Sequence, residues 1–219
     1  MKPQDLTLRC VDIAGHRLYV VLYNREQTPG VMLTWGNPGL GLSIRGAELL
    51  LKGVDSMKEI QIDEAAALPE PTWTPETAAH QGVKERIVEL LHRSPQDPAK
   101  IKVRPHDVFL YPTGMGAIFH TSNQLLEYRP GTIVIAGVVF HNTYHHLLEE
   151  CPHGWKHAGK VDTQGLDDLE AWLEGEKKEG RPVSYLFIEF PGNPTLDSPD
   201  LRRVKKMVSL SPASACSAE

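Results

Sequence analysis

The stretch TIVIAGVV at residues 132–139 decides the fold, because it is almost entirely apolar and reads as a buried strand. A second such stretch, VSYLFIEF, occupies residues 183–190. Between them, residues 166–178 carry Leu166 and Leu169 at helical spacing and form an amphipathic helix. Apolar strands separated by amphipathic helices are typical of a parallel sheet that is covered on both faces.

Shorter segments extend this alternation in both directions. We expect further strands at residues 108–111 and 155–159, and further helices at residues 114–128, 142–150 and 198–207. Strand and helix therefore alternate four times, which predicts an α/β fold with a doubly wound parallel sheet. In such sheets, ligands bind beyond the carboxyl ends of the strands, so the loops after Tyr111, Val139 and Phe190 are the places to look for chemistry.

The first third of the chain is less regular. Residues 17–23 (RLYVVLY) predict a strand, and the glycine-rich residues 31–46 predict an extended or looping segment. Residues 47–51 could begin a short helix. A longer helix is expected from Thr74-Pro75, a cap followed by proline, to about His92.

Composition places the chain among globular proteins. Its 219 residues are 41% hydrophobic and carry a formal charge of −5, which argues against a dedicated nucleic-acid binder. The cysteines Cys10, Cys151 and Cys216 form no C-x-x-C pair, so zinc and thioredoxin-like sites are not indicated. With no apolar run suited to a signal peptide or a membrane span, the chain is predicted to be cytoplasmic, without a membrane partner.

The loop at residues 112–116 (PTGMG) is expected to open a helix, where unpaired backbone N–H groups suit a phosphate. It lacks the Walker A and GxGxxG spacings, so an ordinary strand-to-helix turn remains an alternative. Phe140, beyond the next strand, could stack on a planar ligand or pack in the core. Asn193, between Pro191 and Pro194, could donate to a ligand oxygen or close a tight turn.

Four segments together resemble a known family. They are YPTGMGAI at residues 111–118, VVFHNTY at 138–144, EFPGNPTLDSPDLRRVKK at 189–206 and WGNPGLGLSIRGAELL at 35–50. They look like the Cys/Met-metabolism branch of fold-type I pyridoxal-phosphate enzymes, and they are most similar to fungal cystathionine γ-synthase-like proteins. The resemblance covers roughly residues 31–207.

This resemblance implies pyridoxal 5'-phosphate as the cofactor and a role for five residues. Gly114 and Met115 would give backbone N–H groups to its phosphate, and Phe140 would stack on its pyridine ring. Asn193 would hydrogen-bond the phenolic oxygen of the ring. Arg45 would reach the phosphate held by a neighbouring subunit, because such enzymes build each site across a dimer interface.

The resemblance also implies a division of the chain. Residues 1–104 would be an N-terminal arm with a leading helix, and residues 105–207 the first half of the cofactor-binding α/β domain, with an incomplete doubly wound sheet. Residues 208–219 would be a tail foreign to the family. The lysine that forms a Schiff base in the family comes well after the Asn-Pro turn, on a later strand of the same domain, whereas only Lys205 and Lys206 follow that turn here. We therefore expect no catalytic residue, and no turnover by this chain alone.

By this resemblance, the chain is a truncated transferase or lyase of transsulfuration and methionine biosynthesis, with an amino-acid substrate and a dimeric or tetrameric assembly. The segments present do not distinguish γ-synthase, γ-lyase and β-lyase reactions. A second hypothesis is a non-catalytic fragment that associates with a full-length homologue. A third is a metal-binding module based on His141 and His145, which are spaced four residues apart.

Overall fold

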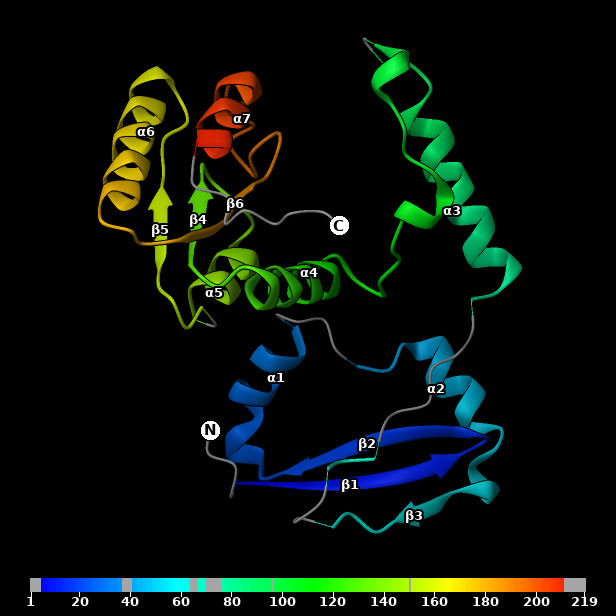
Figure 1. Ribbon diagram of the computed structural model, residues 1–219. Coiled ribbons are helices and arrows are strands. Elements are labelled where there is room, and N and C mark those ends of the chain that lie inside the picture. The colour runs from blue at the N-terminus through cyan, green and yellow to red at the C-terminus, as the bar shows by residue number, and fades with distance from the viewer. Residues whose placement is uncertain are drawn as a thin grey trace. The chain divides into compact units, whose positions relative to one another are not determined.

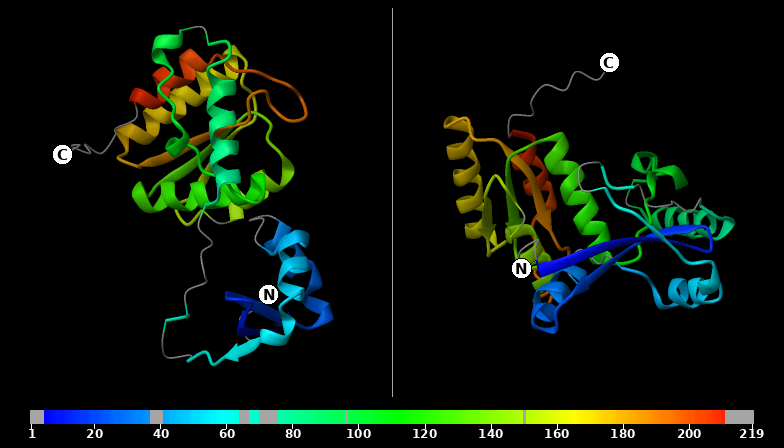
Figure 2. Two further views of the ribbon diagram at one scale, coloured as in Figure 1. Left: turned by 90° about the vertical axis from the view of Figure 1, so that its right-hand side faces the viewer. Right: turned by 90° about the horizontal axis from the view of Figure 1, so that it is seen from below.

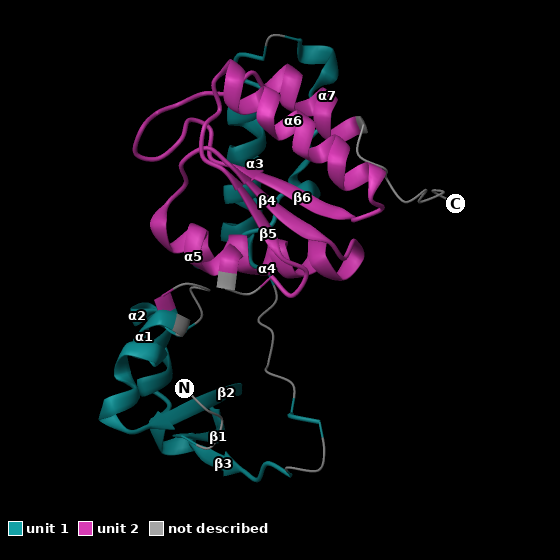
Figure 3. Ribbon diagram, turned by 90° about the vertical axis from the view of Figure 1, so that its left-hand side faces the viewer, with its two compact units in different colours: residues 1–35, 40–113 teal, residues 36–39, 114–219 magenta. Residues whose placement is uncertain are grey.

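The computed structural model describes residues 5–36, 41–63, 67–69, 76–95, 97–149 and 151–210 (Figure 1). The chain divides into two compact units. The first comprises residues 1–35 and 40–113, and the second comprises residues 36–39 and 114–219 (Figure 3).

The first unit contains a three-stranded antiparallel sheet in the order β2-β1-β3, with β1 at Leu6–Ile13, β2 at His16–Tyr23 and β3 at Lys58–Ile60. A two-residue turn joins β1 to β2 in a long hairpin (Figure 2). Its residues Ala14 and Gly15 both have positive φ, at 49° and 79°. Two-residue hairpin turns of this kind follow the right-handed twist of the strands that they join. The strand predicted at residues 17–23 is confirmed, whereas β1 was not predicted.

The helices of this unit are α1 (Thr28–Gly36), α2 (Ile44–Leu51) and α3 (Ala78–Leu91). Single turns of 3-10 helix occupy Arg25–Gln27, Val54–Ser56, Pro98–Lys100 and Pro105–Asp107.

The looping segment predicted at residues 31–46 is wrong at both ends, because residues 31–36 belong to α1 and residues 44–46 to α2. Gly36 lies in the last turn of α1 and Gly46 in the first turn of α2, and glycine is tolerated at helix ends. The expected short helix at residues 47–51 is confirmed as part of α2.

Helix α3 begins later than expected. Its N-cap is Thr77, whose backbone N–H donates to His80 Nδ1 at 3.1 Å. The predicted start at Thr74-Pro75 lies outside the described residues. The helix ends at Leu91 with His92 as its C-cap, close to the predicted end.

The second unit is built on a parallel sheet in the order β5-β4-β6, with β4 at Thr132–Ala136, β5 at Trp155–Ala158 and β6 at Val183–Ile188. Its helices are α4 (Gly114–Tyr128), α5 (His141–Glu149), α6 (Thr163–Lys178) and α7 (Leu201–Leu210). The α/β class and the parallel sheet are thereby confirmed. The doubly wound arrangement and the domain boundaries stay predictions.

The strand predicted at residues 108–111 is wrong, since this segment is irregular. Among the described strands none pairs with it, and Phe109 is 75% exposed. A short apolar run forms a strand only where another strand supplies hydrogen bonds, and Pro112 ends this run.

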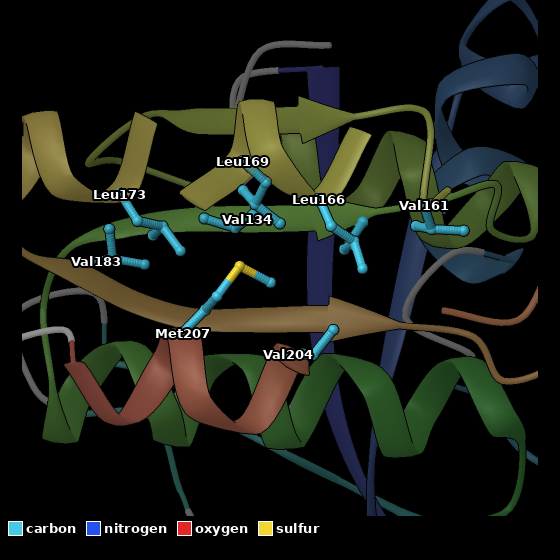
Figure 4. Packing of buried hydrophobic residues seen from close by; sticks show 9 residues of the cluster. Val134, Val161, Leu166, Leu169, Leu173, Val183, Val204 and Met207 are labelled. Carbon is cyan, nitrogen blue, oxygen red and sulfur yellow. The ribbon is translucent and has the colours of Figure 1, made fainter. Parts of the chain in front are cut away.

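Successive residues of β4 enter two different cores. Ile133 and Ile135 pack with Leu147 of α5 and with side chains of α4. Val134 and Ala136 pack with a layer made by α6 and α7, which Figure 4 shows beside β4 and β6. None of these four β4 residues is more than 1% exposed, which explains why the strand is apolar at every position.

In the sequence DLRR at residues 200–203, Asp200 and Arg203 have structural roles in the α6–α7 layer. Asp200 Oδ1 accepts hydrogen bonds from the backbone N–H groups of Arg202 and Arg203, at 2.9 and 3.2 Å, and so caps α7. Arg203 Nη2 pairs with Asp167 and Glu170 of α6, at 2.5 and 2.9 Å. The helix predicted from residue 198 therefore begins three residues later than expected, at Leu201, with Asp200 as its cap.

No helix in the described part of the chain has both the length and the apolar character needed to cross a membrane.

A hydroxyl pair joins α4 to β6. Ser122 Oγ and Tyr185 Oη lie 2.6 Å apart. Burial raises the pKa of Tyr185 to about 12, and the hydrogen bond with Ser122 only partly opposes this shift.

Because an exposed phenol has a pKa of about 10, the neutral form of Tyr185 favours the folded chain. This contribution to stability is fully present below about pH 10 and is lost as the pH rises through the folded pKa of about 12. Between about pH 10 and pH 12, the free energy of unfolding should therefore fall less in Tyr185→Phe than in the unaltered chain. In a phenolate absorbance titration, the variant should lack one late-titrating tyrosine, and superimposable titration curves would contradict this assignment.

Candidate functional site

The segment that follows β4 carries the centre of the candidate site. Gly137 donates its backbone N–H to Ala158 O at 2.8 Å, and its own carbonyl lies 2.9 Å from His157 Nε2. Gly137 has φ +80°, a conformation that turns the chain out of the sheet. Residues 138–140 then lead into α5 and are held by hydrogen bonds from the segment after β6.

The loop after β6 folds against this segment. Asn193 donates its backbone N–H to Val138 O at 3.3 Å. The loop closes on itself through Gly192 N–H to Asp197 O at 2.9 Å and Leu196 N–H to Gly192 O at 2.8 Å. A Cβ atom at Gly192 would lie 3.2 Å from Val138 O, so glycine permits this close approach.

A pocket of about 380 Å³ lies where these two loops meet, and its lining includes Phe140 and Asn193. The other lining residues are Val138, Val139, His141, Tyr144, His157 and Pro194. The structure thus brings together two of the residues that the sequence singled out. Phe140 is 45% exposed, so its ring is not a core side chain. The Asn193 side chain is exposed and makes no hydrogen bond to a described residue.

Two pocket residues, Tyr144 and His157, were not predicted. Their rings lie 5.1 Å apart between centroids in an edge-on arrangement. His157 occupies the end of β5, next to the central strand. A signal was present, because the carboxyl end of every parallel strand is a candidate ligand position and residues 155–159 were expected to be a strand.

Gly114 and Met115 begin α4 and do not line this pocket. Met115 is nonetheless connected to it through α5, since Thr143 Oγ1 approaches Met115 Sδ at 3.6 Å. Gly114 is exposed, and a Cβ atom added there would meet no atom of the described residues within 4 Å. The phosphate role of Gly114 and Met115 stays a prediction.

Arg45 lies in the other unit, in the first turn of α2, and is exposed. The serine of the Ser-x-Arg motif has a structural role there. Ser43 caps α2 by accepting the Gly46 backbone N–H at 3.1 Å. The role of Arg45 stays a prediction.

The metal-binding hypothesis finds no support in the described residues. His141 and His145 lie on α5 with ring centroids 4.3 Å apart. Within residues that the structure describes, no group of three or more His, Cys, Asp or Glu side chains could hold a metal ion.

A family model for aminotransferase class I and II matches residues 48–216. An alanine racemase, ungC, of Aspergillus violaceofuscus is 31% identical over 199 residues, which make up 87% of this chain and 34% of that protein. A cystathionine gamma-synthase of Neurospora crassa is 38% identical over 111 residues, 48% of this chain and 17% of that protein. A cystathionine gamma-synthase-like enzyme, iboG1, of Amanita muscaria is 26% identical over 242 residues, 93% of this chain and 40% of that protein.

The chain thus spans between 17% and 40% of the length of these relatives. No solved structure matches the chain.

Gly137 and Gly175 form a matched pair that tests the geometry at the end of β4. Gly137→Ala should lower the free energy of unfolding by more than about 1 kcal/mol, because alanine is strained at positive φ and its Cβ would lie 3.2 Å from Val161. Gly175→Ala, inside α6 with open space at the Cβ position, should raise it by about 0.5–1 kcal/mol. Denaturant titrations measure both, and equal effects would contradict the conformation of Gly137.

Proposed function

The chain belongs to the aminotransferase class I and II family, and from that premise we propose that its second unit supplies the cofactor pocket of a cystathionine γ-synthase-like enzyme. Membership of this family implies pyridoxal 5'-phosphate as the cofactor. The observation that carries the proposal is that Phe140 and Asn193, 53 residues apart in the sequence (193 − 140), line one pocket beyond the sheet.

The pocket fits a planar heterocycle that bears an oxygen substituent. The half-exposed ring of Phe140 offers an aromatic face for stacking. The side-chain amide of Asn193 can donate to a ring oxygen, since it makes no hydrogen bond to a described residue. Gly114 and Met115 would give backbone N–H groups to the phosphate at the start of α4, a 15-residue helix.

When bound, pyridoxal phosphate acts as an electron sink for reactions of amino acids. We propose an amino-acid substrate and a reaction of transsulfuration, as in methionine biosynthesis, on the strength of the relatives named cystathionine gamma-synthase. An amino-acid racemase is the second candidate, because the relative named alanine racemase matches 87% of this chain. Arg45 would serve a neighbouring subunit in a homodimer or homotetramer.

This chain would hold the cofactor without a covalent bond. The lysines that follow Asn193 in the sequence are Lys205 and Lys206. Both are exposed on α7, and neither lines the pocket. We therefore propose that these 219 residues provide binding contacts and that no residue among them is catalytic; the alternative is a non-catalytic role in association with a full-length homologue.

Binding of pyridoxine 5'-phosphate tests the pocket, because this analogue lacks the aldehyde and needs no lysine. Phe140→Ala should weaken binding by about 3- to 10-fold through the loss of stacking, and Asn193→Ala by about 5-fold through the loss of a hydrogen bond. Phe140→Tyr should retain the affinity. Isothermal titration calorimetry gives each dissociation constant.

The matched control is Phe109→Ala, which removes an exposed phenylalanine of the other unit and should leave the affinity unchanged. The proposal fails if the unaltered chain does not bind the analogue, or if the Phe140 and Phe109 variants weaken binding equally.

A further inference from the structure

Phe140 is the N-cap residue of α5, but its apolar side chain cannot accept a hydrogen bond from the first turn of the helix. The helix begins at His141, and Phe140 O accepts the first intrahelical hydrogen bond, from Tyr144 N–H at 3.0 Å. In a capping box, a Glu or Gln at the third helical position would also bind the backbone N–H of the N-cap residue. In α5 this position is Thr143, a fully buried side chain that turns toward Met115.

The residue that follows β6 supplies the missing acceptor. Glu189 Oε1 accepts the backbone N–H of Phe140 at 2.8 Å, across 49 residues of sequence. The pairing of β4 with β6 ends at Ala136 and Ile188, so Glu189 is the first residue beyond the ladder. A carboxylate at this place also interacts favourably with the positive end of the α5 dipole.

We propose that Glu189 is a positioning residue, which completes the cap of α5 from the end of the neighbouring strand β6 and thereby holds the Phe140 ring over the pocket. The stacking role of that ring rests on the function proposed above, whereas the cap itself does not.

Nothing else described fixes the Phe140 amide as directly. The residue is 45% exposed, so it is not enclosed in a core. The other bond between these loops, from Asn193 N–H to Val138 O, is longer at 3.3 Å and lies two residues earlier in the chain. A charged acceptor at 2.8 Å is the stronger of the two constraints. Because both bonds come from the segment after β6, they fix the positions of Phe140 and Asn193 relative to each other.

The variants Glu189→Ala and Glu189→Gln separate the acceptor from the charge. Alanine removes the acceptor, whereas glutamine keeps a carbonyl oxygen that can accept the same N–H. Glu174→Ala is the control, because Glu174 is an exposed residue of α6. Circular dichroism and thermal melts establish that each variant folds.

The first readout is hydrogen exchange of the Phe140 amide in the chain without ligand. Exchange should accelerate about 5- to 30-fold in Glu189→Ala, stay within about threefold in Glu189→Gln, and be unchanged in Glu174→Ala. The second readout is affinity for pyridoxine 5'-phosphate, which should fall about 5-fold or more in Glu189→Ala and recover in Glu189→Gln.

Unchanged exchange at Phe140 in Glu189→Ala would overturn the cap. Faster exchange with unchanged affinity would overturn the link between the cap and the pocket. If the unaltered chain binds no analogue, the proposed function fails and the link to stacking fails with it, while the exchange data still decide whether Glu189 caps α5.

Discussion

Burial of β4 on both of its faces is the constraint on which the second unit depends. Four consecutive residues of this strand, 133–136, are at most 1% exposed, and they alternate between a core with α4 and α5 and a core with α6 and α7. A strand enclosed in this way cannot shift by one residue without exchanging its two cores. Its end is therefore fixed, and so is the place where the chain leaves the sheet.

The candidate site is a consequence of that fixed end. Gly137 turns the chain out of β4 while β5 holds both of its backbone polar groups, through Ala158 and His157. The segment after β6 then holds Val138 and Phe140. Polar contacts from β5 and from the segment after β6 thus fix a stretch of four residues that has no regular structure of its own. A rigid scaffold carrying a short loop is the usual arrangement for binding residues.

Some features could be predicted from the sequence because their signals are local. The bounds of α4, residues 114–128, agree with the prediction, because a glycine-rich start and an apolar periodicity mark the helix. Phe140 and Asn193 could be placed beyond strand ends because each follows a nearly continuous apolar run. The strand β1 was missed although its pattern alternates, and residues 108–111 were assigned as a strand although no described strand pairs with them. Strand formation depends on a partner that local sequence does not reveal.

The contacts that complete the site were beyond prediction from sequence. Glu189 reaches Phe140 across 49 residues, and no spacing rule connects the two. Arg203 likewise looked like part of a family motif, whereas the structure gives it ion pairs with Asp167 and Glu170 of α6. Residues of such a motif can thus serve packing and capping as well as ligand contact.

The most direct test of the account is a map of backbone amide chemical shifts on addition of pyridoxine 5'-phosphate. If the segments around Gly114, Phe140 and Asn193 form one cofactor pocket, the backbone amides of these three residues should shift together and saturate at the same ligand concentration. Shifts confined to residues outside these three segments, or separate saturation of Phe140 and Asn193, would contradict it.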